Sequence, residues 1–327
     1  MLRRLVAISP PCRGNVNRMN LSALGNLSHR LKLVGTLPPK LVAAKIAKRL
    51  PWSNKRAVRI AEIVHSPKDR EADRLLGFFR TQESFLVENE GWAPIDFTGR
   101  NVLEIGPGPL GGLSLMAVFR GAERVYGVEP DWVDDVLTDP AIEDAYLRPH
   151  HNVLSAAFGN LMDYATFRTR LGERLKIDAV GLSDATPGFA ADIVLSNSCL
   201  EHIGDLPDAL SALVDFTADD ARHMHLVNFG NHRDREAPFA TIYEMPPDQY
   251  RLKYGAHINL LRASDVFAAS ASAGLGLSMA IVDQPVEKAE AVDLHPYWRD
   301  NYEMDDLAVR TALYFTPMSN ETESPIP

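Results

Sequence analysis

One segment, residues 102–112, constrains the fold of this chain more than any other. A short apolar run leads directly into Gly106, Gly108 and Gly111. Glycine lets the main chain adopt positive φ and approach a ligand closely. A helix that begins after such a turn offers unpaired N–H groups and the positive end of its dipole. The segment therefore predicts a strand, a tight turn and a helix that together bind a nucleotide-like ligand.

The rest of the chain alternates between strand-like and helix-like patterns. Strands are predicted at 101–105, 124–128, 192–196, 223–229, 275–282 and 309–315, and helices at 40–50, 68–89, 112–120, 206–216 and 264–273. Strands that alternate with helices favour an α/β fold, in which a mostly parallel sheet carries helices on both faces.

Two acidic residues make the glycine turn more specific. Glu104 lies inside the end of the first strand, where a carboxylate suits a cationic ligand and repels a pyrophosphate. Glu129 ends the next strand, 21 residues after Gly108. From that position a carboxylate accepts both ribose hydroxyls in Rossmann-like sites. The alternative is that both are strand-end acids whose partners are water or helix N-termini.

Three motifs then resemble one family, the class I S-adenosylmethionine-dependent methyltransferases. The run 103–108, with the glycines that follow it, resembles the first motif of this family. Residues 128–130 resemble the second motif. Residues 192–203, which end in Leu-Glu-His-Ile, resemble a later motif. They occur in the family's order within residues 97–316, although Leu110 stands where a simple repeat has its third glycine. The resemblance implies S-adenosylmethionine as cofactor and a Rossmann-like sheet with one late antiparallel strand.

The resemblance also implies cofactor contacts. Besides Glu104, Glu129 and the three glycines, Asn197 is expected beside the methionine part of the cofactor. An acid after the third strand should contact the adenine; Asp184 is our choice and Asp178 the alternative.

Methyl transfer needs alignment and exclusion of water, and a hydroxyl acceptor must also lose a proton. His232, just past a strand end, is the first candidate base, and His202 is the second. The alternatives are a loop histidine bonded to the main chain and a structural histidine. His223 and His225 are expected to pack beneath a helix.

Residues 233–262 form a long insertion that we interpret as a lid. Its tyrosines and Arg262 suit contacts with a sugar, and the run 259–262 together with His232 resembles methyltransferases found beside bacterial glycan-assembly enzymes. The hypothesis is therefore methyl transfer to a small molecule or glycan, at oxygen.

Charge divides the chain unevenly. Residues 1–61 hold 13 Lys and Arg and no acid, whereas the rest holds 21 basic and 43 acidic residues. The leader has three interpretations: a transit peptide, a patch that contacts an anionic surface, or a basic face that is solvated or packs against the acidic body. We expect a basic appendage at 1–69, a methyltransferase domain at 70–318 and a flexible tail at 319–327.

Two cysteines far apart in sequence predict neither a disulfide framework nor a structural zinc site, so we expect no bound metal. We also expect a reducing, cytoplasmic location, and peripheral contact with a membrane is the alternative.

Three other functions stay open. An NAD-dependent oxidoreductase would share the turn and Glu129 but would not need Glu104. A nucleic-acid methyltransferase would use the basic leader, against which the acidic body argues. A non-catalytic scaffold would bind no cofactor.

Overall fold

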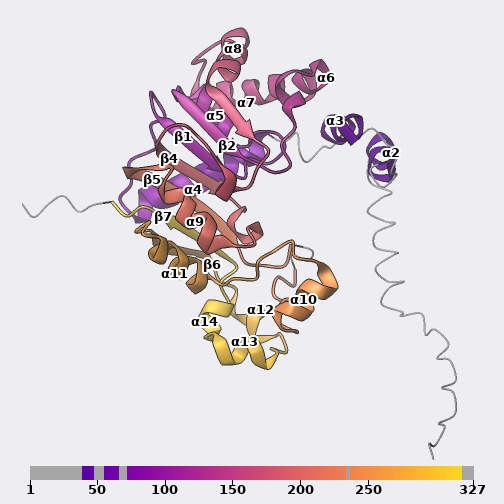
Figure 1. The fold of residues 1–327 in the computed structure, drawn as a ribbon, viewed down its shortest axis with the longest axis vertical. Coiled ribbons are helices and arrows are strands. Elements are labelled where there is room, and N and C mark those ends of the chain that lie inside the picture. Colours follow the sequence, from indigo (N-terminus) through magenta and orange to yellow (C-terminus); the bar gives the residue numbers. More distant parts are fainter. Residues whose placement is uncertain (1–38, 48–54, 66–71, 233, 235, 319–327) are drawn as a thin grey trace, which may run out of the picture. The chain divides into compact units, whose positions relative to one another are not determined.

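The computed structural model describes residues 39–47, 55–65, 72–232, 234 and 236–318 (Figure 1). The chain divides into two compact units, residues 1–66 and residues 67–327. The predicted tail at 319–327 and most of the predicted basic leader lie outside the described residues.

The first unit contains two helices, α2 (Pro39–Ala47) and α3 (Lys55–His65), which pack against each other. Leu41 and Ala44 lie three residues apart on one face of α2, and both are buried. The helix predicted at 40–50 is observed from Pro39 to Ala47, and residues 48–50 lie outside the described residues. None of the helices in the described ranges has both the length and the apolar character that a membrane crossing requires.

The second unit is built on one seven-stranded sheet with the order β3-β2-β1-β4-β5-β7-β6. Its strands are β1 (Asn101–Ile105), β2 (Arg124–Val128), β3 (Leu175–Asp178), β4 (Ala191–Asn197), β5 (Thr217–Asn228), β6 (Ser278–Asp283) and β7 (Thr311–Phe315). β7 pairs antiparallel with both β5 and β6, whereas β1 to β5 pair in parallel. The expected Rossmann-like α/β fold with one late antiparallel strand is confirmed.

Helices cover both faces of this sheet (Figure 1). On one face lie α4 (Ala72–Asn89), α5 (Ser114–Phe119), α7 (Arg148–Phe158) and α8 (Tyr164–Arg174). On the other lie α9 (Leu206–Val214) and α11 (Ala263–Ala273), whose leucine, valine and alanine side chains join the main apolar core with β1, β4 and β7. Because β1 and β4 continue to helices on opposite faces, their carboxyl ends leave a crevice between them, where open α/β sheets bind ligands.

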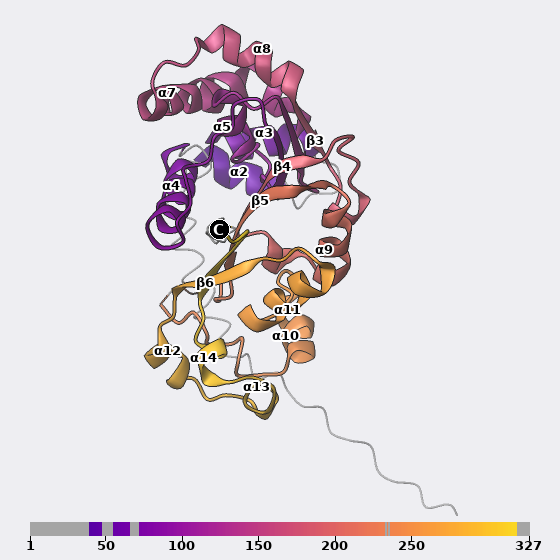
Figure 2. The same ribbon diagram turned by 90° about the vertical axis from the view of Figure 1, so that its left-hand side faces the viewer.

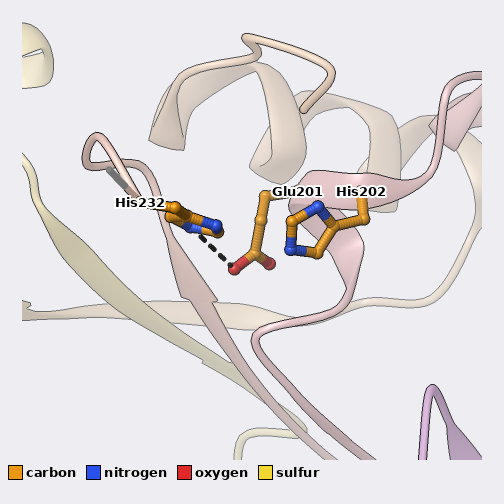
Figure 3. Close-up of side chains that lie close together, drawn as sticks. All are labelled: Glu201, His202 and His232. Carbon is orange, nitrogen blue, oxygen red and sulfur yellow. Dashed lines mark ion pairs between the residues drawn. The ribbon is translucent and has the colours of Figure 1, made fainter. Parts of the chain in front are cut away.

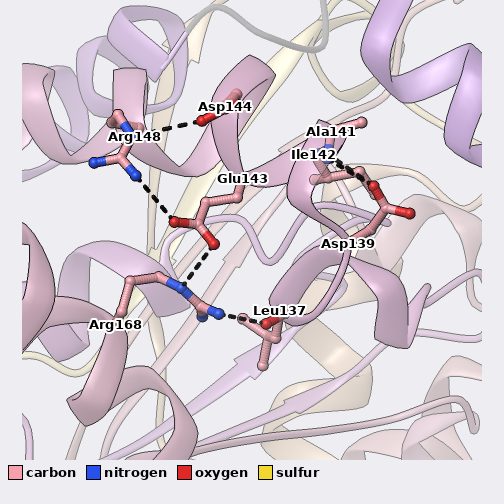
Figure 4. Close-up of polar contacts among 8 residues, drawn as sticks. All are labelled: Leu137, Asp139, Ala141, Ile142, Glu143, Asp144, Arg148 and Arg168. Carbon is pink, nitrogen blue, oxygen red and sulfur yellow. Dashed lines mark hydrogen bonds and ion pairs between the residues drawn. The ribbon is translucent and has the colours of Figure 1, made fainter.

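The segment between β2 and α7 was not assigned from the sequence, and polar contacts fix it (Figure 4). It comprises η1 (Asp134–Leu137), α6 (Pro140–Ile142) and η2 (Glu143–Leu147). Asp139 caps α6 by accepting from the N–H of Ala141 at 2.8 Å. Glu143 lies 3.1 Å from Arg148 and 3.7 Å from Arg168. Such partly exposed ion pairs contribute at most about 1 kcal/mol each, so they orient the segment more than they stabilise it.

The described residues of the insertion predicted at 233–262 form part of a packed cluster. It contains α10 (Pro247–Tyr254), and it shares a second apolar cluster with α12 (Val286–Glu290), α13 (Pro296–Asn301) and α14 (Met304–Leu307), which lie together at one end of the unit (Figure 2). Tyr243, Tyr250 and Arg262 are buried in or beside this cluster. The expectation that these three side chains contact a sugar is therefore wrong, because packing has already removed them from solvent.

Candidate functional site

A cavity of about 1320 Å³ opens at the carboxyl ends of the central parallel strands. Of the nine site residues predicted from the sequence, seven line it: Gly106, Gly108, Glu129, Asp184, Asn197, His202 and His232. Glu104 and Gly111 do not. The sequence motifs therefore converge on one cavity, with the glycine turn at one end and two histidines at the other.

The glycine turn passes closely between β2 and the loop after β4. The N–H of Gly106 donates to the carbonyl of Val128 at 2.9 Å. Gly106 has φ +70°, and a Cβ there would overlap the side chain of Cys199. Gly108, at φ +69°, faces open space. The turn thus needs glycine at 106 for both backbone conformation and close packing.

Glu129 follows β2 and faces the turn. Its Oε2 accepts from the N–H of Gly108 at 2.8 Å, and its Oε1 accepts from the N–H of Asp131 at 2.9 Å. Each carboxylate oxygen can accept a second hydrogen bond. The side chain is therefore oriented by the protein and still has acceptor capacity toward a diol in the cavity.

Glu104 lies beneath the turn, with 2% of its surface exposed. It accepts from the N–H of Leu113 at 2.9 Å and from the N–H and hydroxyl of Ser114 at 2.5 and 2.6 Å. Burial raises the pKa of its carboxyl to about 7, against the opposing effect of these hydrogen bonds. The structure therefore gives Glu104 a supporting position, and not one on the cavity wall where the sequence-based hypothesis had it.

Gly111 has a similar supporting position. It has φ +87°, and a Cβ there would contact Leu115. Its neighbour Gly112, at φ +41°, passes so close to Glu104 that a Cβ would meet the carboxylate. Both glycines shape the turn from the side opposite the cavity.

Two acids were candidates for the adenine end, and the structure separates them. Asp184, in η3 (Leu182–Asp184), lines the cavity. Asp178 lies at the end of β3, where its Oδ2 accepts from Tyr126 at 2.5 Å and from Lys176 at 2.8 Å. Asp178 is thus engaged within the sheet, which leaves Asp184 beside the ligand space.

Helix α4 also contributes to the cavity, which the sequence did not reveal. Arg74, Leu75 and Phe78 line it. On the same helix, buried Gln82 donates to Oδ1 of Asn197 at 2.8 Å and so orients that side chain. The sequence predicted a helix at 68–89, but a contact between residues 115 positions apart leaves no local signal in the sequence.

The far end of the cavity is lined by His202 and His232, and the buried Glu201 lies close to both (Figure 3). Glu201 and His202 belong to η4 (Leu200–His202), directly after β4, and His232 follows β5. The Nε2 of His232 lies 3.7 Å from Oε1 of Glu201, and the two imidazole centres are 5.0 Å apart. Burial raises the pKa of Glu201 to about 8. Burial, followed by the neighbouring His202, lowers the pKa of His232.

The insertion holds this end in place. The Nδ1 of His202 lies 2.5 Å from the carbonyl oxygen of His257. Asn259 donates from its side chain to the carbonyls of Leu200 and Ile203 at 2.8 and 3.0 Å. Asn259, the first residue of the run 259–262 noted from the sequence as a family resemblance, thus hydrogen-bonds to the loop that carries Glu201 and His202.

Neither the protein-family models nor the curated proteins contain a match to this chain. Solved structures do show similarity. A phosphoethanolamine N-methyltransferase from Haemonchus contortus in complex with S-adenosyl-L-methionine has 14% identity and a TM-score of 0.45, over 84% of this chain and 60% of that one. A geranyl diphosphate C-methyltransferase from Streptomyces coelicolor has 16% identity and a TM-score of 0.40, over 83% and 87%.

An O-methyltransferase family protein from Burkholderia thailandensis has 13% identity and a TM-score of 0.40, over 86% of this chain and 72% of that one. At these identities the similarity concerns the fold. What each of those proteins binds or methylates is a property of that protein, so the site of this chain is interpreted from its own residues.

Proposed function

We propose that this chain is an S-adenosylmethionine-dependent methyltransferase that acts on a hydroxyl group of a small molecule or glycan. The observation that carries the proposal is the arrangement around Glu129. Its carboxylate is oriented by the N–H of Gly108, and Asp184 and Asn197 line the same cavity. The carboxylate of Glu129 can accept hydrogen bonds from the two ribose hydroxyls of this cofactor, and the glycine turn lets the main chain come close to it. Asp184 suits the adenine, and Asn197 suits the methionine part.

The histidine end of the cavity supports an oxygen acceptor. Methyl transfer to a hydroxyl requires loss of the O–H proton, and an amine or carbanion acceptor has less need of this step. His202 and His232, the candidate catalytic residues, line the cavity, and Glu201 lies close to both. A cluster with one acid and two imidazoles suits proton removal from a hydroxyl.

Calorimetric titration with S-adenosylmethionine, S-adenosylhomocysteine and NAD tests the cofactor assignment. Glu129→Ala should weaken both adenosyl ligands by about 2–4 kcal/mol, because two hydrogen bonds to a charged acceptor are lost. Glu129→Gln keeps one acceptor oxygen and should have an intermediate effect. Glu123→Ala is the matched control, since Glu123 precedes the same strand at its other end and its largely exposed side chain pairs with Arg174.

The three alternatives give different results. Binding of NAD alone would establish an oxidoreductase, and absence of binding by all three ligands would leave a non-catalytic scaffold. Tight, salt-sensitive RNA binding by the full chain would favour a nucleic-acid acceptor.

The acceptor is tested separately, with methyl-labelled S-adenosylmethionine and a panel of sugars, hydroxylated small molecules and matched amines. The proposal expects an O-methyl ether, recognised by the carbon chemical shift of the transferred methyl group. An N-methyl product would refute the oxygen assignment and leave the cofactor assignment intact. The cellular compartment and the role of the basic leader stay predictions.

A further inference from the structure

Three potential metal ligands converge at the acceptor end of the cavity from two different strands. One ligand atom from each of Glu201, His202 and His232 lies within 4.8 Å of the other two. In Figure 3 the Glu201 carboxylate stands between the two imidazole rings. Ligands on one ion at ~2.1 Å lie about 3 Å apart, so small side-chain movements would bring all three onto a common centre.

Glu201 is the unusual member of this cluster. It has 3% of its surface exposed, and its Oε1 accepts a long bond from the N–H of Asn228, at 3.3 Å. Within the described part of the chain its Oε2 has no hydrogen-bond partner. A buried carboxyl oxygen without a partner is costly. A cation between the two histidines would satisfy it.

His202 is arranged as a metal-binding histidine usually is, with its second ring nitrogen bonded to the protein. Because a carbonyl oxygen only accepts, Nδ1 of His202 must donate to His257, which leaves Nε2 unprotonated in the neutral ring. The Nε2 of His232 lies 3.7 Å from Oε1 of Glu201.

We propose that Glu201, His202 and His232 bind one divalent first-row transition metal ion. Two imidazoles and one carboxylate suit Zn²⁺, Fe²⁺, Mn²⁺ or Co²⁺ better than Mg²⁺ or Ca²⁺, which prefer oxygen ligands. Three protein ligands leave coordination positions free, and the two histidines line the cavity. The ion would therefore be open to the acceptor.

The chemistry rests on the proposed methyl transfer. A hydroxyl bound to the ion has a pKa lowered toward neutrality, and its proton passes to water. The resulting alkoxide oxygen attacks the methyl carbon of the cofactor. The new C–O bond forms as the C–S bond breaks, and the electron pair goes to sulfur, which becomes a neutral thioether. His232 then holds the ion and does not itself take the proton.

Metal titration of the full chain tests the site without reference to activity. After dialysis against a chelator, Co²⁺ is added and its visible absorption is recorded, and Zn²⁺ is then used to displace it. We expect one equivalent of Co²⁺, with the affinity lowered by about a hundredfold or more in Glu201→Gln and His232→Gln. Glu201→Gln keeps the side-chain shape, and His232 is 25% exposed, so neither substitution opens the core. His65→Gln on α3 is the control.

The metal site and the proposed function fail in different ways. If Co²⁺ binds no more tightly to the unmodified chain than to the two variants, the metal site is refuted, and Glu129-dependent binding of S-adenosylhomocysteine would stand. If Co²⁺ binds through these residues but neither adenosyl ligand binds, the metal site stands and the methyl-transfer chemistry does not. Unchanged S-adenosylhomocysteine affinity in Glu201→Gln would show that the substitution acts at the metal alone.

Discussion

The buried carboxyl of Glu104 predicts that the protein loses stability as pH rises through neutrality. The side chain is 2% exposed and accepts three hydrogen bonds, all from Leu113 and Ser114. Burial nevertheless raises its pKa from 4.5 to about 7 in the folded chain. The folded state therefore favours the protonated form. This contribution is fully present below pH 4.5 and is lost as pH rises through about 7.

The size of the effect follows from the two pKa values. At about 1.4 kcal/mol for each pKa unit, complete ionisation costs the folded state about 3 kcal/mol relative to the unfolded chain. Between about pH 5 and pH 8 the expected loss is about 2–3 kcal/mol, because the unfolded carboxyl is already partly ionised at the lower pH.

Urea unfolding of the unmodified chain and of Glu104→Gln, over that pH range, isolates this group. Other titrating residues are common to both proteins, so the difference between their free energies of unfolding carries the Glu104 contribution. The free energy of unfolding of the unmodified chain minus that of Glu104→Gln should fall with rising pH. The corresponding difference for Glu123→Gln should not change with pH. A constant difference for Glu104→Gln would refute the reasoning, because it would mean that the three hydrogen bonds fully compensate burial.

Two further predictions concern other buried groups. Asn259→Asp would turn a carboxylate toward the carbonyls of Leu200 and Ile203, which now accept from the Asn259 side chain. The substitution should lower Co²⁺ affinity about tenfold in a metal titration. S-adenosylhomocysteine affinity, measured by calorimetric titration, should stay unchanged. Burial lowers the pKa of His150 to about 4. Because the unfolded chain takes up a proton at His150 below about pH 6.5 and the folded chain does not, His150 alone should cost about 3 kcal/mol of stability between pH 6.5 and pH 4. The change in the free energy of unfolding over this range should therefore differ by about that amount between the unmodified chain and His150→Phe in urea unfolding. An equal change in the two proteins would contradict the prediction.

What the sequence predicted well is local in the chain. The strand before Gly106 and the strand before Glu129 were predicted with the bounds that β1 and β2 have, because each is an apolar run with glycine or an acid at its end. β3 was not placed from the sequence. It has only four residues and carries the exposed Lys176, so its apolar character is too slight to distinguish it from a loop.

The side chains that the sequence missed act over long distances. Gln82 reaches Asn197 across 115 residues. The cluster at the other end of the cavity was only half predicted. His202 and His232 were identified, but each as a base, and Glu201 was not named among the site residues. Strand pairing explains why Glu201 and His202 lie near His232. β4 and β5 are parallel neighbours, and Asn197 on β4 pairs with Leu226 on β5. Residues that follow these two strands must therefore reach the same edge.

The two ends of the cavity are built in different ways, and this difference has a functional consequence. The cofactor end depends on the parallel strands and the glycine turn. The acceptor end depends on the insertion, where Arg262 donates to the carbonyl of Phe229, three residues before His232, and to the hydroxyl of Tyr243. This insertion has its own apolar cluster, separate from that of the sheet. We therefore expect substitutions in 236–262 to change acceptor choice and metal affinity while cofactor affinity stays constant.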